Sequence, residues 1–246
     1  MLRSRILAAL TFSLTFGLTA IACDDEGSSP RARLFFAHQL YTQGPLEIFI
    51  DGKRVGEATS NTIDTSQVRE IGTGTHTVTV RARGASLELA SAELTFGEQT
   101  YLIGIFQRPG DTSTVYIRHY GEGEPESIPA QRAAIQVVNF LTEQATGGER
   151  QAIPVDVYVN SALVAAGVDF GAASAYTLLS AGERAVVQVY RAGELPGEGI
   201  PLRMSDAASS GVVNVREGKA IVLSLLNTDL SVDAPPKVQV RAFALR

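Results

Sequence analysis

An eight-residue segment that occurs twice limits the folds open to this chain more than any other feature of its sequence. Residues 45–52 read PLEIFIDG, and residues 154–161 read PVDVYVNS. In each copy aliphatic residues alternate with an acidic and an aromatic residue, and two turn-forming residues follow. This pattern predicts a strand that runs into a hairpin turn. Two copies of a unit of roughly 90–110 residues suit two small β-sandwiches.

The segments on either side of the two copies also match. An apolar strand is expected before each copy, at 34–38 and 135–139, and a strand that leaves a glycine is expected after it, at 74–78 and 182–186. The order of these segments is the same in both places. We therefore predict that the chain contains one β domain twice.

The rest of the sequence predicts strands as well. Apolar and polar residues alternate over 77–82, 86–91 and 237–242, which is typical of strands with one buried face. The runs at 101–106 and 221–226 are almost wholly apolar and fit central strands covered on both faces, with a short helix as the alternative for such a run. No stretch shows an amphipathic helical stripe with a cap and a stop. The predicted fold is all-β, with two tandem antiparallel sandwiches.

Composition narrows the class of protein. The chain is 45% hydrophobic and 19% charged, so it can build a core, and wholesale disorder is excluded. Its net charge of −5 argues against binding to a nucleic acid backbone, which needs a basic face. A single cysteine excludes a disulfide scaffold and a cysteine-rich zinc site.

The first 22 residues have the layout of a secretory signal. Arg3 and Arg5 form a basic start, and the uncharged, mostly apolar stretch 6–22 ends in small residues. The acidic run 24–26 follows with no basic stop-transfer cluster, so we expect a cleaved signal peptide at 1–22. An uncleaved membrane helix is the alternative, since 17 residues lie at the lower limit for spanning a bilayer.

The only cysteine lies directly after this stretch. Ala20, Ile21, Ala22 and Cys23 resemble the bacterial lipobox, although Ala20 stands where leucine is commonest. The resemblance implies cleavage before Cys23 and acylation of its thiol and new amine. Two or three acyl chains give stable membrane anchoring, whereas one does not. Polar residues 24–30 would then act as a flexible tether.

Both copies resemble the DUF4397 family. The first copy matches through Arg33–His38 and Leu46–Gly52, and the second through Ile135–Asn139 and Pro154–Ser161. Further matches in the second copy lie at 168–171 and 176–182. It departs from the family at Ser161, where glycine is usual, and in a longer loop at 147–153. The resemblance implies exported bacterial Ig-like domains, often repeated, and it supplies no catalytic residues.

These features divide the chain into five expected parts. They are a signal peptide at 1–22, a lipidated cysteine and tether at 23–32, a first sandwich at 33–120, a Gly-, Pro- and Glu-rich linker at 121–132, and a second sandwich at 133–246.

Candidate catalytic and metal-binding residues are few. His38, His76 and His119 have no metal-ligand spacing, and we expect them at the surface or facing loops. Glu47 and Asp156 are expected on solvent faces, or alternatively as acceptors of turn hydrogen bonds. No nucleophile elbow occurs, and the acidic runs lack the alternating ligands of a calcium loop. We predict no catalytic, cofactor-binding or metal-binding residue.

The sequence therefore favours a non-catalytic, membrane-anchored lipoprotein of the bacterial cell envelope. It would act in adhesion, scaffolding or partner binding through loops and strand edges. An envelope receptor for a glycan or small ligand, with a pocket between the two domains, is the alternative. An envelope hydrolase is a third, less favoured hypothesis.

Overall fold

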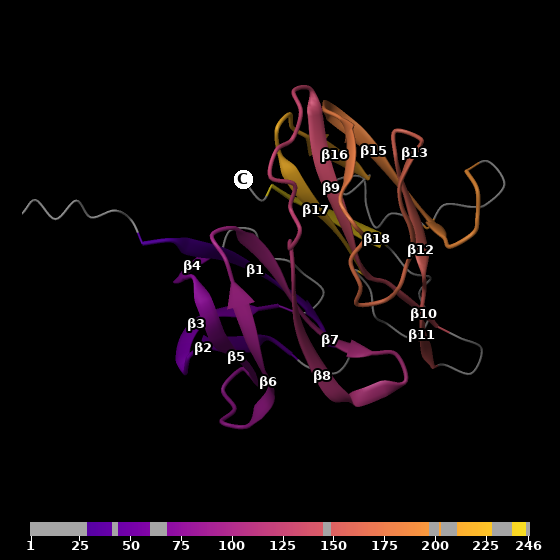
Figure 1. Cartoon of the computed structure of the whole chain (residues 1–246). Coiled ribbons are helices and arrows are strands. Elements are labelled where there is room, and N and C mark those ends of the chain that lie inside the picture. The colour runs from indigo at the N-terminus through magenta and orange to yellow at the C-terminus, as the bar shows by residue number, and fades with distance from the viewer. Residues whose placement is uncertain are drawn as a thin grey trace, which may run out of the picture.

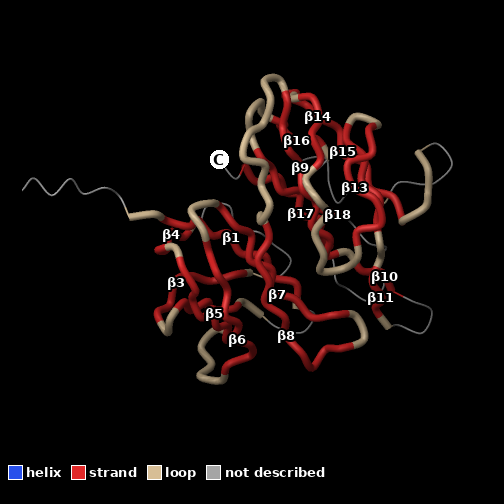
Figure 2. Tube along the Cα trace, in the orientation of Figure 1, coloured by secondary structure: helices blue, strands red, loops and turns tan. Residues whose placement is uncertain are grey.

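The computed structural model describes residues 29–40, 44–59, 68–144, 149–196, 202, 211–227 and 238–244. All regular structure in these ranges is β-strand (Figures 1 and 2). The predicted all-β fold is confirmed.

The first half of the chain forms two four-stranded sheets. Its strands are β1 (Arg31–Gln39), β2 (Leu46–Ile50), β3 (Lys53–Ala58), β4 (Arg69–Gly72), β5 (Gly74–Ala82), β6 (Glu88–Phe96), β7 (Thr100–Arg108) and β8 (Asp111–Tyr120). The sheet orders are β4-β1-β7-β8 and β3-β2-β5-β6.

The second half repeats this arrangement strand for strand. Its strands are β9 (Arg132–Phe140), β12 (Val155–Val159), β13 (Ala162–Val168), β14 (Thr177–Ser180), β15 (Gly182–Arg191), β16 (Val212–Val215), β17 (Ala220–Asn227) and β18 (Val238–Ala244). They form sheets of order β14-β9-β17-β18 and β13-β12-β15-β16. One addition is a small hairpin of β10 (Thr142–Gln144) and β11 (Arg150–Ala152), which coincides with the longer loop of the second copy.

Most strand pairs are antiparallel, as expected, but each half also contains one parallel pair. β1 pairs with β7, with Leu34 opposite Tyr101, and β9 pairs with β17, with Ile135 opposite Ile221. The matching registers allow residues of the paired strands in one half to be assigned equivalents in the other. Period-two alternation is the same in parallel and antiparallel strands, so the sequence pattern did not reveal this pairing.

The duplicated segment builds the same hairpin in both halves. The two turn residues have positive φ, 49° and 76° at Asp51 and Gly52 and 50° and 66° at Asn160 and Ser161. A side-chain oxygen of each first turn residue accepts a backbone hydrogen bond, from Thr77 at 2.9 Å and from Val186 at 2.8 Å. These are features of a type I′ turn, whose twist matches that of the flanking strands.

A separate apolar core fills each sandwich. In the first half it includes Leu34, Ile48, Val80 and Ile103, and in the second half Ile135, Val157, Val189 and Leu223. In each set, two residues come from each facing sheet. Both halves are therefore β-sandwiches in the physical sense of two sheets packed on a shared core.

A third apolar cluster lies between the two halves. It joins the outward faces of β1 and β7 to those of β9 and β17, and we call it the inter-sheet cluster: Phe35, Ala37, Leu102, Phe106, Tyr120, Ala134, Val138, Phe140, Ala220, Val222 and Leu226. The rings of Phe106 and Phe140 lie 5.4 Å apart, and the Tyr120 hydroxyl donates to Gly171 O at 2.9 Å. Residues 101–106 and 221–226 are buried throughout, which confirms the prediction of strands covered on both faces.

Candidate functional site

The residues predicted to be processed and lipidated lie outside the described residues. These are Ala20, Ile21 and Ala22 at the cleavage bond and Cys23 at the acyl site. The structure therefore does not bear on them, and their roles stay predictions.

The three histidines occupy different environments. His38 is completely buried in β1, so the expectation of surface or loop-facing histidines is wrong for this residue. Burial lowers its pKa to about 4, against the opposing effect of the Thr59 backbone. His76 Nδ1 lies 2.7 Å from Asp51 Oδ2, and the hydrogen bond with His76 holds the pKa of Asp51 below its usual range. His119 Nε2 lies 2.7 Å from Glu122 Oε1.

The two acidic strand residues also differ from each other. Asp156 is buried and accepts hydrogen bonds from the backbone of Gly167 at 2.7 Å and of Gly193 at 2.9 Å. The alternative expectation, that the carboxylate accepts turn hydrogen bonds, is therefore right for this residue. Glu47 is partly exposed and pairs with Arg54, with 3.0 Å between Oε1 and Nε. Glu57 lies opposite Glu47 on β3, and Arg54 pairs with both carboxylates.

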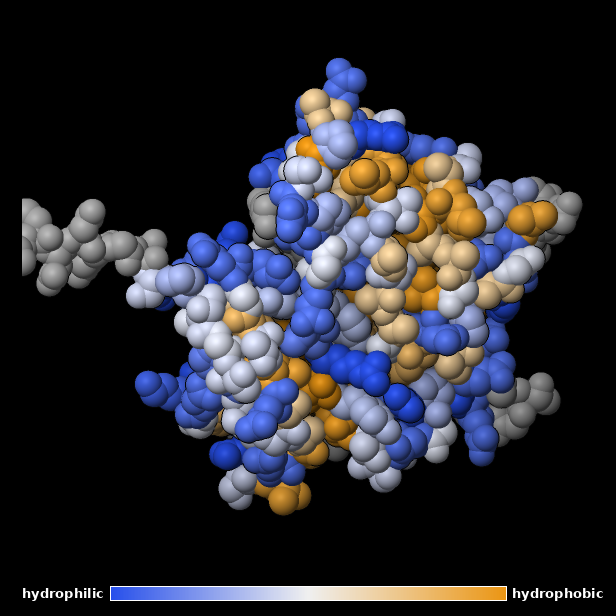
Figure 3. All heavy atoms as spheres, in the orientation of Figure 1, coloured by the Kyte–Doolittle hydropathy of each residue, from blue (hydrophilic) through white to orange (hydrophobic). Residues whose placement is uncertain are grey.

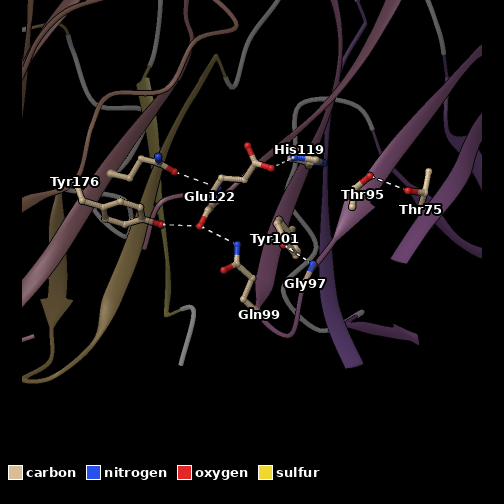
Figure 4. Close-up of polar contacts among 10 residues, drawn as sticks. Thr75, Thr95, Gly97, Gln99, Tyr101, His119, Glu122 and Tyr176 are labelled. Carbon is tan, nitrogen blue, oxygen red and sulfur yellow. Dashed lines mark hydrogen bonds and ion pairs between the residues drawn. The ribbon is translucent and has the colours of Figure 1, made fainter. Parts of the chain in front are cut away.

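One end of the first sandwich is closed by a cluster of rings, which we call the ring plug: His76, Phe96, Tyr101 and His119. Ring centroids lie 5.1 Å apart for Phe96 and Tyr101, 5.3 Å for Tyr101 and His119, and 5.5 Å for Phe96 and His119. The Tyr101 hydroxyl accepts a hydrogen bond from the Gly97 backbone at 2.8 Å (Figure 4). The plug fills the space between β6 and β8.

Gly121, which follows β8, begins the connection to the second half, and its backbone is held by three hydrogen bonds. Its carbonyl accepts hydrogen bonds from Gln99 and from the Tyr176 hydroxyl, each at 3.2 Å (Figure 4). Its N–H donates to Gln136 Oε1 at 3.1 Å. Burial raises the pKa of Tyr176, so its hydroxyl stays protonated and remains a donor. These bonds and the inter-sheet cluster occupy the region where a pocket between the domains was expected.

The outer sheet of the first half has a charged surface. Arg54 pairs with both Glu47 and Glu57, and Arg83 Nε lies 3.6 Å from Glu57 Oε1. The Arg81 guanidinium lies 4.5 Å from the centre of the Phe49 ring. Charged residues also occupy the first half's edge strands β3, β4 and β6. Charges on edge strands oppose pairing with other chains.

In the second half the equivalent edge strands β13, β14 and β16 have no charged residue at all. By register, exposed apolar residues stand where the first half has polar or charged ones: Leu163 for Arg54, Leu178 for Glu70, Val186 for Thr77 and Val212 for Glu93. These four are 49%, 42%, 45% and 39% exposed. Figure 3 shows hydrophobic surface gathered over this half of the molecule. Leu163, Val186 and Val212 lie on the outward side of the sheet β13-β12-β15-β16, because their neighbours Val164, Val187 and Val213 belong to the core. We call these three residues the apolar face; Leu178 lies on the other sheet.

The described residues include neither a metal-binding cluster nor an apolar helix of membrane-spanning length. No three His, Cys, Asp or Glu side chains among them are grouped to hold a metal ion. Nor does a helix long and apolar enough to span a bilayer occur in these ranges.

Comparison with known proteins gives no assignment. No family model matches the chain, and no curated protein matches its sequence. The resemblance to DUF4397 therefore stays a prediction. The apolar face was missed at the sequence level, although aligning KRVGEA with ALVAAGV in the two copies would have shown the loss of charge.

Proposed function

We propose that the protein is a non-catalytic lipoprotein of the bacterial cell envelope that binds another protein. It would be exported, cleaved before Cys23 and held at a membrane by acyl chains on that residue. Its function would be adhesion or scaffolding. The supporting sequence features are the signal-like first 22 residues and the single cysteine at their end.

The observation that supports partner binding is the apolar face with its uncharged edge strands. A strand edge offers unpaired backbone groups to an extended segment of another chain, and apolar side chains beside it add specificity. The first half blocks this mode with arginine and glutamate at equivalent positions, whereas the second half does not. The proposed partner therefore presents an extended, largely uncharged segment.

The overall arrangement is compatible with this mode of binding. An anchor would join the chain ahead of β1. In Figure 1 the start of β1 lies at one side of the molecule, while β12 and β13 lie at the opposite side. A tether at the first half would leave the second half free to meet a partner.

The experiment is crosslinking in intact cells, followed by identification of the captured protein. Leu163→Arg and Val212→Glu introduce the residues found at the equivalent first-half positions, Arg54 and Glu93. The same fold therefore accommodates these side chains in the first half. We expect each to reduce capture of the partner about tenfold. Leu87→Arg is the control, because Leu87 is 74% exposed in a loop of the first half. Undiminished capture by both test variants would show that the apolar face is not the binding surface.

Cys23→Ser tests the anchor in the same cells. We expect the variant to lose incorporated acyl label and to leave the membrane fraction. If it stayed in membranes with the label intact, the lipoprotein assignment would be wrong.

A further inference from the structure

His76 connects two segments at one end of the first sandwich. Its Nδ1 lies 2.7 Å from Asp51 Oδ2 in the turn between β2 and β3, and its Nε2 lies 3.0 Å from Gly72 O. Gly72 ends β4 in one sheet and Gly74 begins β5 in the other, so the chain crosses between the sheets at Thr73. The imidazole therefore joins this crossover to the β2–β3 turn.

Both ring nitrogens of His76 face oxygen atoms that act only as acceptors. One is a backbone carbonyl, and the other belongs to a carboxyl group whose pKa the hydrogen bond with His76 holds below its usual range. The Asp51 carboxyl is therefore ionised near neutral pH. A neutral imidazole has one N–H and can donate to only one of these oxygens, whereas an imidazolium donates to both.

The other histidine of the ring plug is bonded differently. His119 Nε2 lies 2.7 Å from Glu122 Oε1 (Figure 4), while its Nδ1 is buried and has no hydrogen-bond partner among the described residues. A single acceptor suits a neutral ring protonated at Nε2. Phe96 contacts both imidazoles, with its ring centroid 6.1 Å from that of His76 and 5.5 Å from that of His119. The charged and titratable groups around His76 are Asp51 and Lys53 at the turn and, beyond Phe96, His119 with Glu122.

Residues that do not titrate stand at the same joint of the second half. By register, Ala185 occupies the place of His76, and Asn160 occupies the place of Asp51. The Asn160 side chain still accepts the backbone hydrogen bond of its turn, as Asp51 does. The second hairpin therefore forms without an imidazole between the turn and the crossover.

The crossover of each half is bonded to the residue just ahead of the first strand. Thr73 N–H donates to Pro30 O at 3.3 Å, and the equivalent Ala181 N–H donates to Gln131 O at 2.9 Å. Since Pro30 directly precedes β1, the crossover held by His76 lies where the chain enters the first sandwich. The second half thus provides a matched reference for this crossover.

We propose that His76 forms a pH-dependent link at the entry to the first sandwich. With both ring nitrogens protonated, it holds the β4–β5 crossover to the β2–β3 turn. When one proton is lost to solvent, the bond to the Asp51 carboxylate is kept, because a charge-assisted hydrogen bond is stronger than one between neutral groups. Nε2 then presents a lone pair to Gly72 O, and the crossover is released.

The direction of this change follows from the chemistry of the ring. An imidazole changes charge between about pH 5 and about pH 8, so the link opens as the pH rises through this range. The link is separate from the apolar face and does not depend on the proposed function.

Hydrogen exchange of the full-length protein in detergent tests the crossover directly. The protection factor of the Thr73 amide, divided by that of the Ala181 amide, is compared at about pH 5 and about pH 8. We expect this ratio to fall about tenfold at the higher pH. With ¹⁵N-labelled histidine, NMR should show both ring nitrogens of His76 protonated at the lower pH and only Nδ1 at the higher. An unchanged ratio, or a neutral His76 ring at the lower pH, would overturn the proposal.

Three variants assign the response to this residue. His76→Ala introduces the residue of the second half, and His76→Gln keeps a polar side chain that does not titrate; in both, the ratio should be independent of pH. Glu122→Gln is the control, because it changes the partner of the other histidine in the ring plug and should keep the tenfold response. Thermal unfolding establishes that each variant is folded. A tenfold response that persists in either folded His76 variant would contradict the assignment.

Discussion

Ser161 is a residue whose backbone conformation conflicts with its side chain. Its φ of 66° lies in the left-handed region, and its equivalent in the first half is Gly52 with φ of 76°. A side chain with a Cβ atom disfavours this conformation by about 1 kcal/mol. The second hairpin therefore contains local strain that the first avoids.

Exchanging these two residues tests that strain. Ser161→Gly should raise the free energy of unfolding by about 0.5 kcal/mol, because relief of strain exceeds the added entropy of the unfolded chain. Gly52→Ser should lower it by a similar amount. Urea unfolding followed by circular dichroism measures both. A loss of stability in Ser161→Gly would show that the turn is not strained.

At the scale of the strand, β1 and β9 each have a buried polar residue at the penultimate position, His38 and Asn139. Asn139 in β9 donates to Ile153 O at 2.7 Å and to Val168 O at 2.8 Å, and it accepts from Leu141 N at 2.8 Å. It therefore ties the end of the strand to two neighbouring segments. His38 occupies the equivalent place in β1, and its interaction with Thr59 lies beside the end of β3. The first half therefore has the titratable His38 imidazole at the buried position where the second half has the Asn139 amide.

This replacement should make the first half sensitive to acid. The pKa of His38 falls from 6.5 to about 4 on folding, so between these values the unfolded chain binds a proton that the folded chain does not. The free energy of unfolding is therefore unaffected by His38 above pH 6.5. It falls as the pH falls toward 4, by up to about 3 kcal/mol, because the unfolded chain binds the extra proton. We expect His38→Asn to reduce the difference between urea unfolding at pH 7 and at pH 4. Equal pH dependence in both proteins would show that His38 does not titrate in this way.

At the scale of the whole molecule, the inter-sheet cluster makes the two sandwiches one packed body. A Cβ atom added to Gly104 would lie 2.6 Å from Phe140 Cζ and 2.9 Å from Tyr120 Cε2. Contacts this short cannot be accommodated unless the two halves move apart or the rings shift. Gly104 is therefore required by the contact between the halves.

Gly104→Val should uncouple the two sandwiches. We expect a loss of about 1–3 kcal/mol and a thermal transition that broadens or splits, since each half retains its own core. Differential scanning calorimetry measures both effects. Gly44→Ala is the control, because a Cβ there meets no atom within 4 Å. A single unshifted transition in Gly104→Val would indicate that the halves do not depend on this contact.

Most of the local structure can be read from the order of apolar, polar and turn-forming residues along the chain. The unbroken apolar runs at 101–106 and 221–226 predicted strands covered on both faces correctly, because burial of both faces acts directly on residue type. Alternation predicted a strand at 77–82 correctly, but it was wrong for 86–91, where Leu87 precedes β6 and is 74% exposed and Ser91 is exposed as well. The repeated hairpin was also readable, since its turn needs residues that tolerate positive φ.

Which distant segments lie side by side became visible only in the folded molecule. The burial of His38, the parallel pairing of β1 with β7, and the packing of the two halves depend on contacts between segments far apart in the chain. The replacement of the ring plug depends on tertiary structure too, since strand registers are needed to see that Val215, Ile221 and Ala242 stand at the positions of Phe96, Tyr101 and His119. Hydrophobic patterning specifies which side of a strand is buried, but it does not specify the partner that buries it.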